Sequence, residues 1–197
     1  MNAGNAAIDR AALLKLGALG ALSGAISWAI LNFAEQWGID FKVEGEGILL
    51  IPFSVFPGAV FGILFAAVLV LARRTDPLRG FGYIVASSVG YVAAFHLAFN
   101  IIANMPHGGD SLIAYVVGGV PGGFLGSLLL GLAARFLVPA GGPAAFGKSI
   151  VVGALAGALL CLGSLDDHNG LGWLAFFVLW QGLYGASLAP LFADRAR

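Results

Sequence analysis

Charged side chains are scarce in this chain of 197 residues, because only 10% of them are Asp, Glu, Lys or Arg. A water-soluble surface needs roughly 25–35% charged residues, so the composition excludes an ordinary soluble domain. Ten basic and ten acidic residues give a net charge of zero. The chain therefore lacks the excess of positive charge that would indicate a nucleic-acid partner. Cys161 is the single cysteine, which excludes a disulfide within the chain.

Apolar residues dominate instead, at 59% of the chain. Six segments have the roughly 20 mostly apolar residues that cross a bilayer as a helix, and short connections join them. The six segments are 16–34, 48–72, 81–104, 112–138, 147–165 and 171–192. The sequence therefore predicts an all-α integral membrane protein, with one transmembrane domain over residues 1–197 built as a six-helix bundle in the lipid bilayer. The first segment runs past the small-residue cleavage pattern at Ala21-Leu22-Ser23, so we expect a retained helix and not a signal peptide.

The charges predict the orientation of these six spans. If both termini are cytoplasmic, nine of the ten basic residues lie inside and only Lys42 lies outside. Seven of the ten acidic residues then lie outside. This distribution obeys the positive-inside rule. We expect an N-in/C-in protein of a bacterial cytoplasmic (inner) membrane.

Glycine is abundant, at 30 residues, and much of it recurs at a spacing of four. This spacing places residues on one helix face, where small residues let two helix backbones approach closely in lipid. The pairs are Gly20/Gly24, Gly58/Gly62, Gly118/Gly122, Gly122/Gly126 and Gly153/Gly157. We expect them to pack the bundle tightly. Faces left open to lipid would instead hold other membrane subunits or a second copy of the chain.

The second, fourth and sixth segments resemble one another. Each segment contains a dipeptide that ends in glycine, and successive dipeptides are 64 and 60 residues apart: Pro57-Gly58, Pro121-Gly122 and Gln181-Gly182. Each segment then ends in arginine. One interpretation is a parallel repeat of three helical hairpins. The other is coincidence in a glycine-rich chain.

One polar stripe interrupts the apolar spans. His96, Asn100 and Asn104 are four residues apart on the third segment, so they share a face, which we expect to point into the bundle because lipid penalises it. Asn32 and Gln181 are further polar residues of the spans. These five predict a substrate-binding site in the outer half of the bundle, with Trp28, Trp173 and Trp180 as apolar walls. Interhelical hydrogen bonds that only fix packing are the alternative.

Groups for catalysis or metal binding are few. His96 and Asn100 resemble the His-x-x-x-Asn of a rhomboid protease helix, but Gly119-Val120-Pro121-Gly122 has proline where that family has its serine, and the sixth segment lacks a histidine base. Nucleophilic catalysis needs both groups, so we lean against an enzyme. Metal-ligand types collect at His107 and Asp110 and again at 166–168, without a ligand motif. We predict no metal site, and no cofactor is indicated.

The plan of the chain is similar to that of the substrate-binding subunits of energy-coupling-factor vitamin transporters. The likeness lies in size, six helices and a long first outer loop, Glu35–Gly47, and not in any ligand-binding motif. Two hypotheses follow. The first is a protein that binds or transports a small solute by alternating access or by transfer to a partner subunit. The second is a non-catalytic accessory or assembly subunit of a larger membrane complex.

Overall fold

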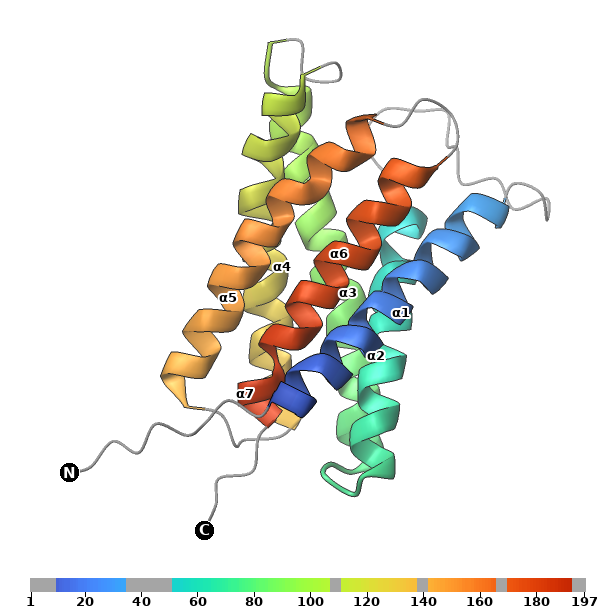
Figure 1. Ribbon diagram of the computed structural model, residues 1–197, viewed down its shortest axis with the longest axis vertical. Helices are drawn as coiled ribbons and strands as arrows, with labels where there is room; N and C mark the ends of the chain where they lie inside the picture. Colours follow the sequence, from blue (N-terminus) through green and yellow to red (C-terminus); the bar gives the residue numbers. More distant parts are fainter. Residues whose placement is uncertain (1–9, 35–50, 107–110, 138–141, 166–169, 193–197) are drawn as a thin grey trace.

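The computed structural model describes residues 10–34, 51–106, 111–137, 142–165 and 170–192. These residues are helical almost throughout and contain no strand. The elements are α1 (Arg10–Ala34), α2 (Ile51–Leu71), α3 (Pro77–Ala103), α4 (Leu112–Leu137), α5 (Pro143–Gly157), the 3₁₀ helix η3 (Ala158–Leu165), α6 (Leu171–Ser187) and α7 (Ala189–Phe192). Figure 1 shows them as one bundle of long, antiparallel rods.

Five spans are long and apolar enough to cross a bilayer, and α2 contributes a shorter apolar helix, Val55–Leu71. In hydrocarbon every backbone N–H and C=O must find a partner within the protein, and a helix satisfies its own. The prediction of an all-α bundle of six membrane helices is confirmed, and the chain is a polytopic membrane protein. The inner-membrane location and the direction of the helices stay predictions.

Three helices, α1, α3 and α5, begin several residues before the expected position. The third span begins at Pro77 and not at residue 81, because the Asp76 carboxylate accepts a hydrogen bond from the Arg79 backbone N–H at 2.9 Å and Pro77 occupies the first turn. This is an ordinary N-cap. The fifth span changes from α-helix to 3₁₀-helix after Gly157 and keeps that form for eight residues. Most 3₁₀ runs end after three or four residues.

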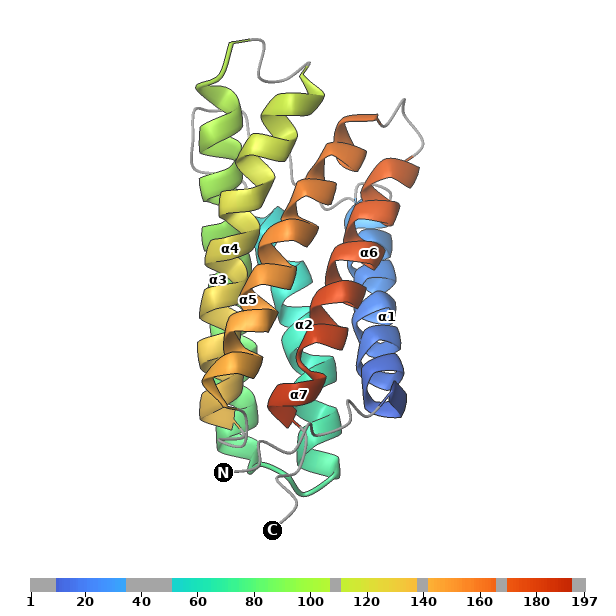
Figure 2. The ribbon, with the colours of Figure 1, turned by 60° about the vertical axis from the view of Figure 1, so that its left-hand side comes forward.

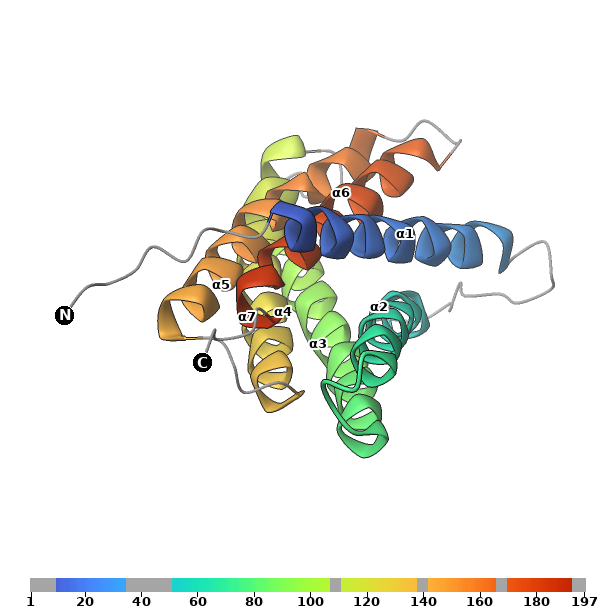
Figure 3. The same cartoon turned by 60° about the horizontal axis from the view of Figure 1, so that its bottom comes forward.

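The helices form a closed ring in chain order. Each packs on the next one along the chain, and α6 returns to pack on α1. Figure 2 shows α3 and α4 on one side and α1 on the other, with α2 and α5 between them. Figure 3 shows α1 lying beside α6 at a marked tilt to α2. We call the end at which α1, α3 and η3 finish the predicted outer end.

Glycine faces make the contacts between neighbouring helices, as expected. A Cβ built on Gly58 would lie 2.6 Å from Ser88 Cα on α3, and one on Gly122 would lie 2.7 Å from the Ala94 carbonyl oxygen. On α1, a Cβ on Gly20 or Gly24 would collide with the α6 backbone. Real Cβ atoms do not approach so closely, so the ring depends on bare backbone at these positions.

The helix α4 carries glycine on two faces. Gly118 and Gly122 face the α3 backbone, whereas Gly119 and Gly123 face Gly153 and Gly157 of α5. A Cβ on Gly119 would collide with the Gly157 carbonyl oxygen, and a Cβ on Gly157 with that of Gly119. The expected pairs are therefore used inside the chain. Gly82, Gly142 and Gly147, by contrast, have open space around them.

Aromatic side chains fill the centre of the ring. From α3, Phe95 contacts Phe176, Phe177 and Trp180 of α6, with ring centroids 6.1–6.3 Å apart. Phe61 of α2 stacks on Phe65 at 4.3 Å. Large rings thus bridge α3 and α6 across the bundle, where the backbones stay apart.

The matched glycines of the suggested hairpin repeat do not make matching contacts. Gly58 of α2 packs on the following helix, α3, whereas Gly122 of α4 packs on the preceding one, also α3. Gly182 of α6 packs on α1. The repeat therefore stays a prediction without support from the helix contacts.

The contact of α4 with α5 gives a first prediction. Gly157→Ala should destabilise the protein by about 1–3 kcal/mol, because the new methyl group meets the Gly119 backbone. Gly82→Ala is the matched control, since the same change on α3 enters open space and favours the helix by up to about 1 kcal/mol. Thermal unfolding of both variants in one detergent measures the difference. Equal unfolding temperatures would contradict the tight contact.

Candidate functional site

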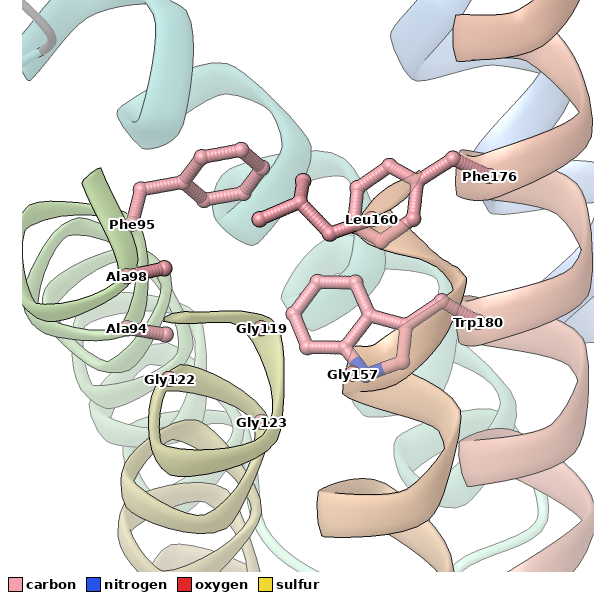
Figure 4. Close-up of a pocket in the computed structure, with 10 residues that line it drawn as sticks. All are labelled: Ala94, Phe95, Ala98, Gly119, Gly122, Gly123, Gly157, Leu160, Phe176 and Trp180. Carbon is pink, nitrogen blue, oxygen red and sulfur yellow. The ribbon is translucent and has the colours of Figure 1, made fainter. Parts of the chain in front are cut away.

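A pocket with a cavity volume of about 20 Å³ lies between α3, α4, η3 and α6, and such a volume has room for about one water molecule. It is closer to the predicted outer end than to the other end, because it uses the first half of α4 and the second half of α3. Figure 4 shows its lining. The lining residues are Ala94, Phe95, Ala98, Gly119, Gly122, Gly123, Gly157, Leu160, Phe176 and Trp180.

The side of the pocket formed by α4 and the end of α5 is mostly bare backbone. Gly119, Gly122 and Gly123 of α4 and Gly157 of α5 contribute no side chain, and Ala94 and Ala98 contribute only methyl groups. Pro121 stands between these glycines and has no N–H to donate, which frees the Val117 carbonyl from its usual helical bond. Glycine packing thus leaves a small hollow where two backbones meet.

The opposite side of the pocket is aromatic. Phe176 and Trp180 of α6 stack with centroids 5.4 Å apart and planes 12° apart. Phe95 of α3 meets both rings edge-on, at 84° and 78°. Tyr91 contacts the other part of the Trp180 ring at 4.9 Å. The indole is therefore held by three neighbours.

The Trp180 indole N–H is the one side-chain hydrogen-bond donor in the pocket lining. Trp180 is 6% exposed, and its Nε1 has no hydrogen-bond partner among the described residues. A buried donor left unpaired costs about 1–3 kcal/mol, and this nitrogen is out of reach of a water-sized molecule.

Gln181, the next residue, is completely buried. Neither its amide nitrogen nor its amide oxygen has a partner in the part of the chain that the structure describes. The Gln181 backbone carbonyl packs against Gly20 of α1. Among the five predicted site residues, Gln181 is thus the one that lies in the interior, and its amide group is unpaired within the described residues.

The His96 stripe lies elsewhere, and our expectation that it points into the bundle is wrong. Asn100 and Asn104 are exposed and His96 is half-buried, whereas Phe95, Ala98 and Ile102 form the buried face of α3. The stripe bonds to its own helix instead. His96 Nδ1 donates to the Val92 carbonyl oxygen at 2.9 Å, and Asn104 Nδ2 donates to that of Asn100 at 2.8 Å. Such bonds reduce the cost of polar groups that face outward.

Asn32 lies on the far side of the ring, near the end of α1. It is exposed, and its Oδ1 would lie 2.9 Å from a Cβ built on Gly170, the left-handed N-cap of α6 (φ 71°). Apart from the bond from the Asn104 side chain to the Asn100 carbonyl oxygen, no side-chain hydrogen bond joins the five predicted residues within the described segments. The structure does not gather them into one site.

The three tryptophans expected as walls have different roles. Trp180 lines the pocket, and Trp173 packs beside it, edge-on to Phe176 at 6.0 Å. Trp28 lies near Gly170, away from the pocket. Sequence reasoning missed Phe95, Leu160 and Phe176. The signal for the pocket was the double pair Gly118-Gly119 and Gly122-Gly123, which places glycine on two faces of one helix.

The described residues contain no set of side chains suited to catalysis or to metal binding. No group of three His, Cys, Asp or Glu side chains could hold a metal there. His107 and Asp110 and residues 166–168 lie outside the described segments. Comparison with protein-family models, with curated proteins and with solved structures gives no match. What the pocket offers is a small apolar space whose lining has one polar side chain, Trp180.

Gln181→Leu should raise the stability of the protein by about 1–3 kcal/mol, because an apolar side chain of similar size replaces two unpaired buried groups. Tyr184→Phe is the contrasting control. It removes a hydroxyl that donates to the Ser127 carbonyl oxygen at 3.1 Å and should lower stability by about 0.5–1.5 kcal/mol. Thermal unfolding measures both. A destabilised Gln181→Leu variant would show that the amide is paired in the membrane.

Proposed function

We propose that this polytopic membrane protein binds a small solute, mostly apolar, in the pocket between α3, α4, η3 and α6, as a step in its transport or in its transfer to a partner. The observation that carries the proposal is the pocket itself, an apolar space between helices whose lining has no charged side chain. Ligand sites in membrane bundles commonly lie between helices near mid-membrane.

The use of the glycine faces supports this function over a purely structural one. The expected glycine pairs contact other helices of the same chain, so these faces are not offered to another subunit. The pocket also lies towards the predicted outer end, where the positive-inside rule places the non-cytoplasmic side. We therefore propose that solute enters from outside the cytoplasmic membrane, with both termini inside.

An assembly subunit is the second candidate, and the outward stripe of α3 favours it. Asn100 and Asn104 are exposed at the predicted outer end of an otherwise apolar helix. Amide side chains there would hydrogen-bond to a partner helix. The five predicted residues thus divide between the candidates: Gln181 lies next to the pocket residue Trp180, and His96, Asn100 and Asn104 form the surface of an assembly subunit. Asn32 belongs to neither.

A pocket-filling variant tests the first candidate. Leu160→Phe puts a larger side chain into the pocket lining, whereas Leu155→Phe makes the same change on a position of α5 that is 67% exposed. Xenon is the probe, because it is a small apolar atom that apolar cavities accept. At ten times its dissociation constant, xenon should stabilise the wild type and Leu155→Phe by about 1.4 kcal/mol and Leu160→Phe hardly at all.

Thermal unfolding with and without xenon under pressure, in the same detergent, gives the result. Equal stabilisation of the two variants would place xenon outside this pocket. A wild type that xenon does not stabilise would remove the pocket as a binding site.

The second candidate has its own measurement. If the stripe holds a second copy of the chain, Asn100→Leu combined with Asn104→Leu should lower the protein mass that light scattering finds in detergent from that of an oligomer to that of one chain. A wild type that is already a single chain would argue against self-assembly through the stripe.

A further inference from the structure

The end of the bundle opposite the predicted outer end is strongly basic, and we call it the predicted inner end. Every Lys and Arg of the described segments lies towards it, at the starts of α1, α3 and α5, at the end of α4 or after α2. Asp76 is the one acidic residue in these segments, and its Oδ2 pairs with Arg79 Nε at 3.2 Å. Arg135 and Lys148 therefore have no carboxylate partner in the described part of the chain.

Two of the arginines lie over aromatic rings of the next helix along the chain. Arg79 Cζ on α3 is 5.9 Å from the centre of the Phe136 ring on α4. Arg135 Cζ on α4 is 5.4 Å from the centre of the Phe146 ring on α5. A guanidinium that stacks on a ring keeps its N–H donors in its own plane, where they can bind another group. The rings thus position two cations side by side around the bundle.

The helices themselves do not use the charges of Arg135 and Lys148. Basic side chains in a last turn often bond to the final carbonyls, but the Leu137 carbonyl oxygen at the end of α4 accepts from Thr75 Oγ1 at 3.0 Å. Arg135 is exposed and lies over Phe146 instead. Lys148 is exposed near the start of α5, where the helix dipole does not favour a positive charge. Both cations are therefore available to an external anion.

Apolar side chains next to these cations face outward from the bundle. On α4, Phe136 is 70% exposed and Leu132, one turn earlier, is 50% exposed. On a membrane helix such side chains contact acyl chains, whereas basic side chains near the helix ends extend to the headgroup layer. The surface therefore offers positive charge at headgroup depth and apolar contact directly below it. A free anion or a soluble acidic partner would use only the first of these, and a phospholipid uses both.

We propose that this surface binds an anionic phospholipid through Arg135, Lys148, Leu132 and Phe136. Arg135 donates to the phosphate, because a guanidinium matches phosphate oxygens with two parallel hydrogen bonds. Lys148 adds a second positive charge, and the acyl chains lie along α4. The predicted orientation puts this site in the cytoplasmic leaflet, whose anionic lipids attract basic side chains. The surface is at the other end of the bundle from the pocket, so the inference does not rest on the proposed function.

Two lipids with the same acyl chains test the headgroup. Phosphatidylglycerol has a net negative charge, and phosphatidylcholine has none. Each Lys or Arg near an anionic headgroup contributes about 1 kcal/mol, which is about fivefold in affinity. With Arg135 and Lys148, the wild type should prefer phosphatidylglycerol by about 25-fold. Thermal unfolding in an uncharged detergent, across a series of lipid mole fractions, gives both affinities.

Arg135→Gln should reduce this preference about fivefold, because phosphatidylglycerol affinity falls and phosphatidylcholine affinity does not. Arg10→Gln is the matched control. It removes the same charge at the same end, but from α1, which lies on the other side of the bundle from α4 (Figure 2). This control should keep the full preference. An equal loss in both variants would show a diffuse attraction between charges and would overturn the site.

Measurements without Arg135→Gln guard against a variant that fails to fold. Arg135→Lys keeps the charge and loses the planar pair of donors, so its preference should lie between those of the wild type and Arg135→Gln. A wild type that binds the two lipids equally would overturn the proposal. An excess of inorganic phosphate should leave phosphatidylglycerol bound, because phosphate lacks the acyl contacts with α4. Displacement of the lipid by phosphate would assign the surface to a soluble anion and overturn the lipid.

Discussion

Direct contact between helix backbones is the constraint on which the structure depends. Lipid tails are as apolar as the helix surfaces, so the hydrophobic effect does not drive the helices together. Close packing must do so, and glycine allows it on α1, α2, α4 and α5. The contacts of α4 are the most demanding, because Gly122 faces α3 and Gly119 faces Gly157 on opposite sides of the same two turns. A side chain on either face would open the ring.

The arrangement of the helices in a ring determines what must fill the centre of the bundle. A ring of six helices encloses more space than small side chains can fill, and Phe61, Phe95, Phe176 and Trp180 fill most of it. Where the glycine side of α4 meets the aromatic side of α6, neither supplies enough volume to close the gap, and the pocket results. The pocket and the tight packing thus have one origin, since the residues that bring α4 and α5 together also leave the space beside them empty.

Much of the fold is predictable from the sequence, because long apolar segments can satisfy their backbone in lipid only as helices. Glycine spacing also predicted which faces pack. The site was harder to predict. Polarity alone suggested that His96 and Asn100 face inward, yet a side chain can bond to its own helix, as His96 does to Val92. Polarity singled out Gln181, which is buried but does not line the pocket. No sequence signal singled out Phe95 and Phe176, which do line it, because nothing local separates a pocket wall from ordinary core.

The 3₁₀ form of η3 has a further effect on the dimensions of the bundle. A 3₁₀-helix rises about 2.0 Å per residue against about 1.5 Å for an α-helix. The 23 residues of Pro143–Leu165 therefore extend about 38 Å, about 4 Å further than a continuous α-helix of the same length. The neighbouring α3 and α4 have 27 and 26 residues and extend about 40 Å. The tighter winding after Gly157 therefore lengthens this span, so that it becomes about as long as α3 and α4 although it has fewer residues.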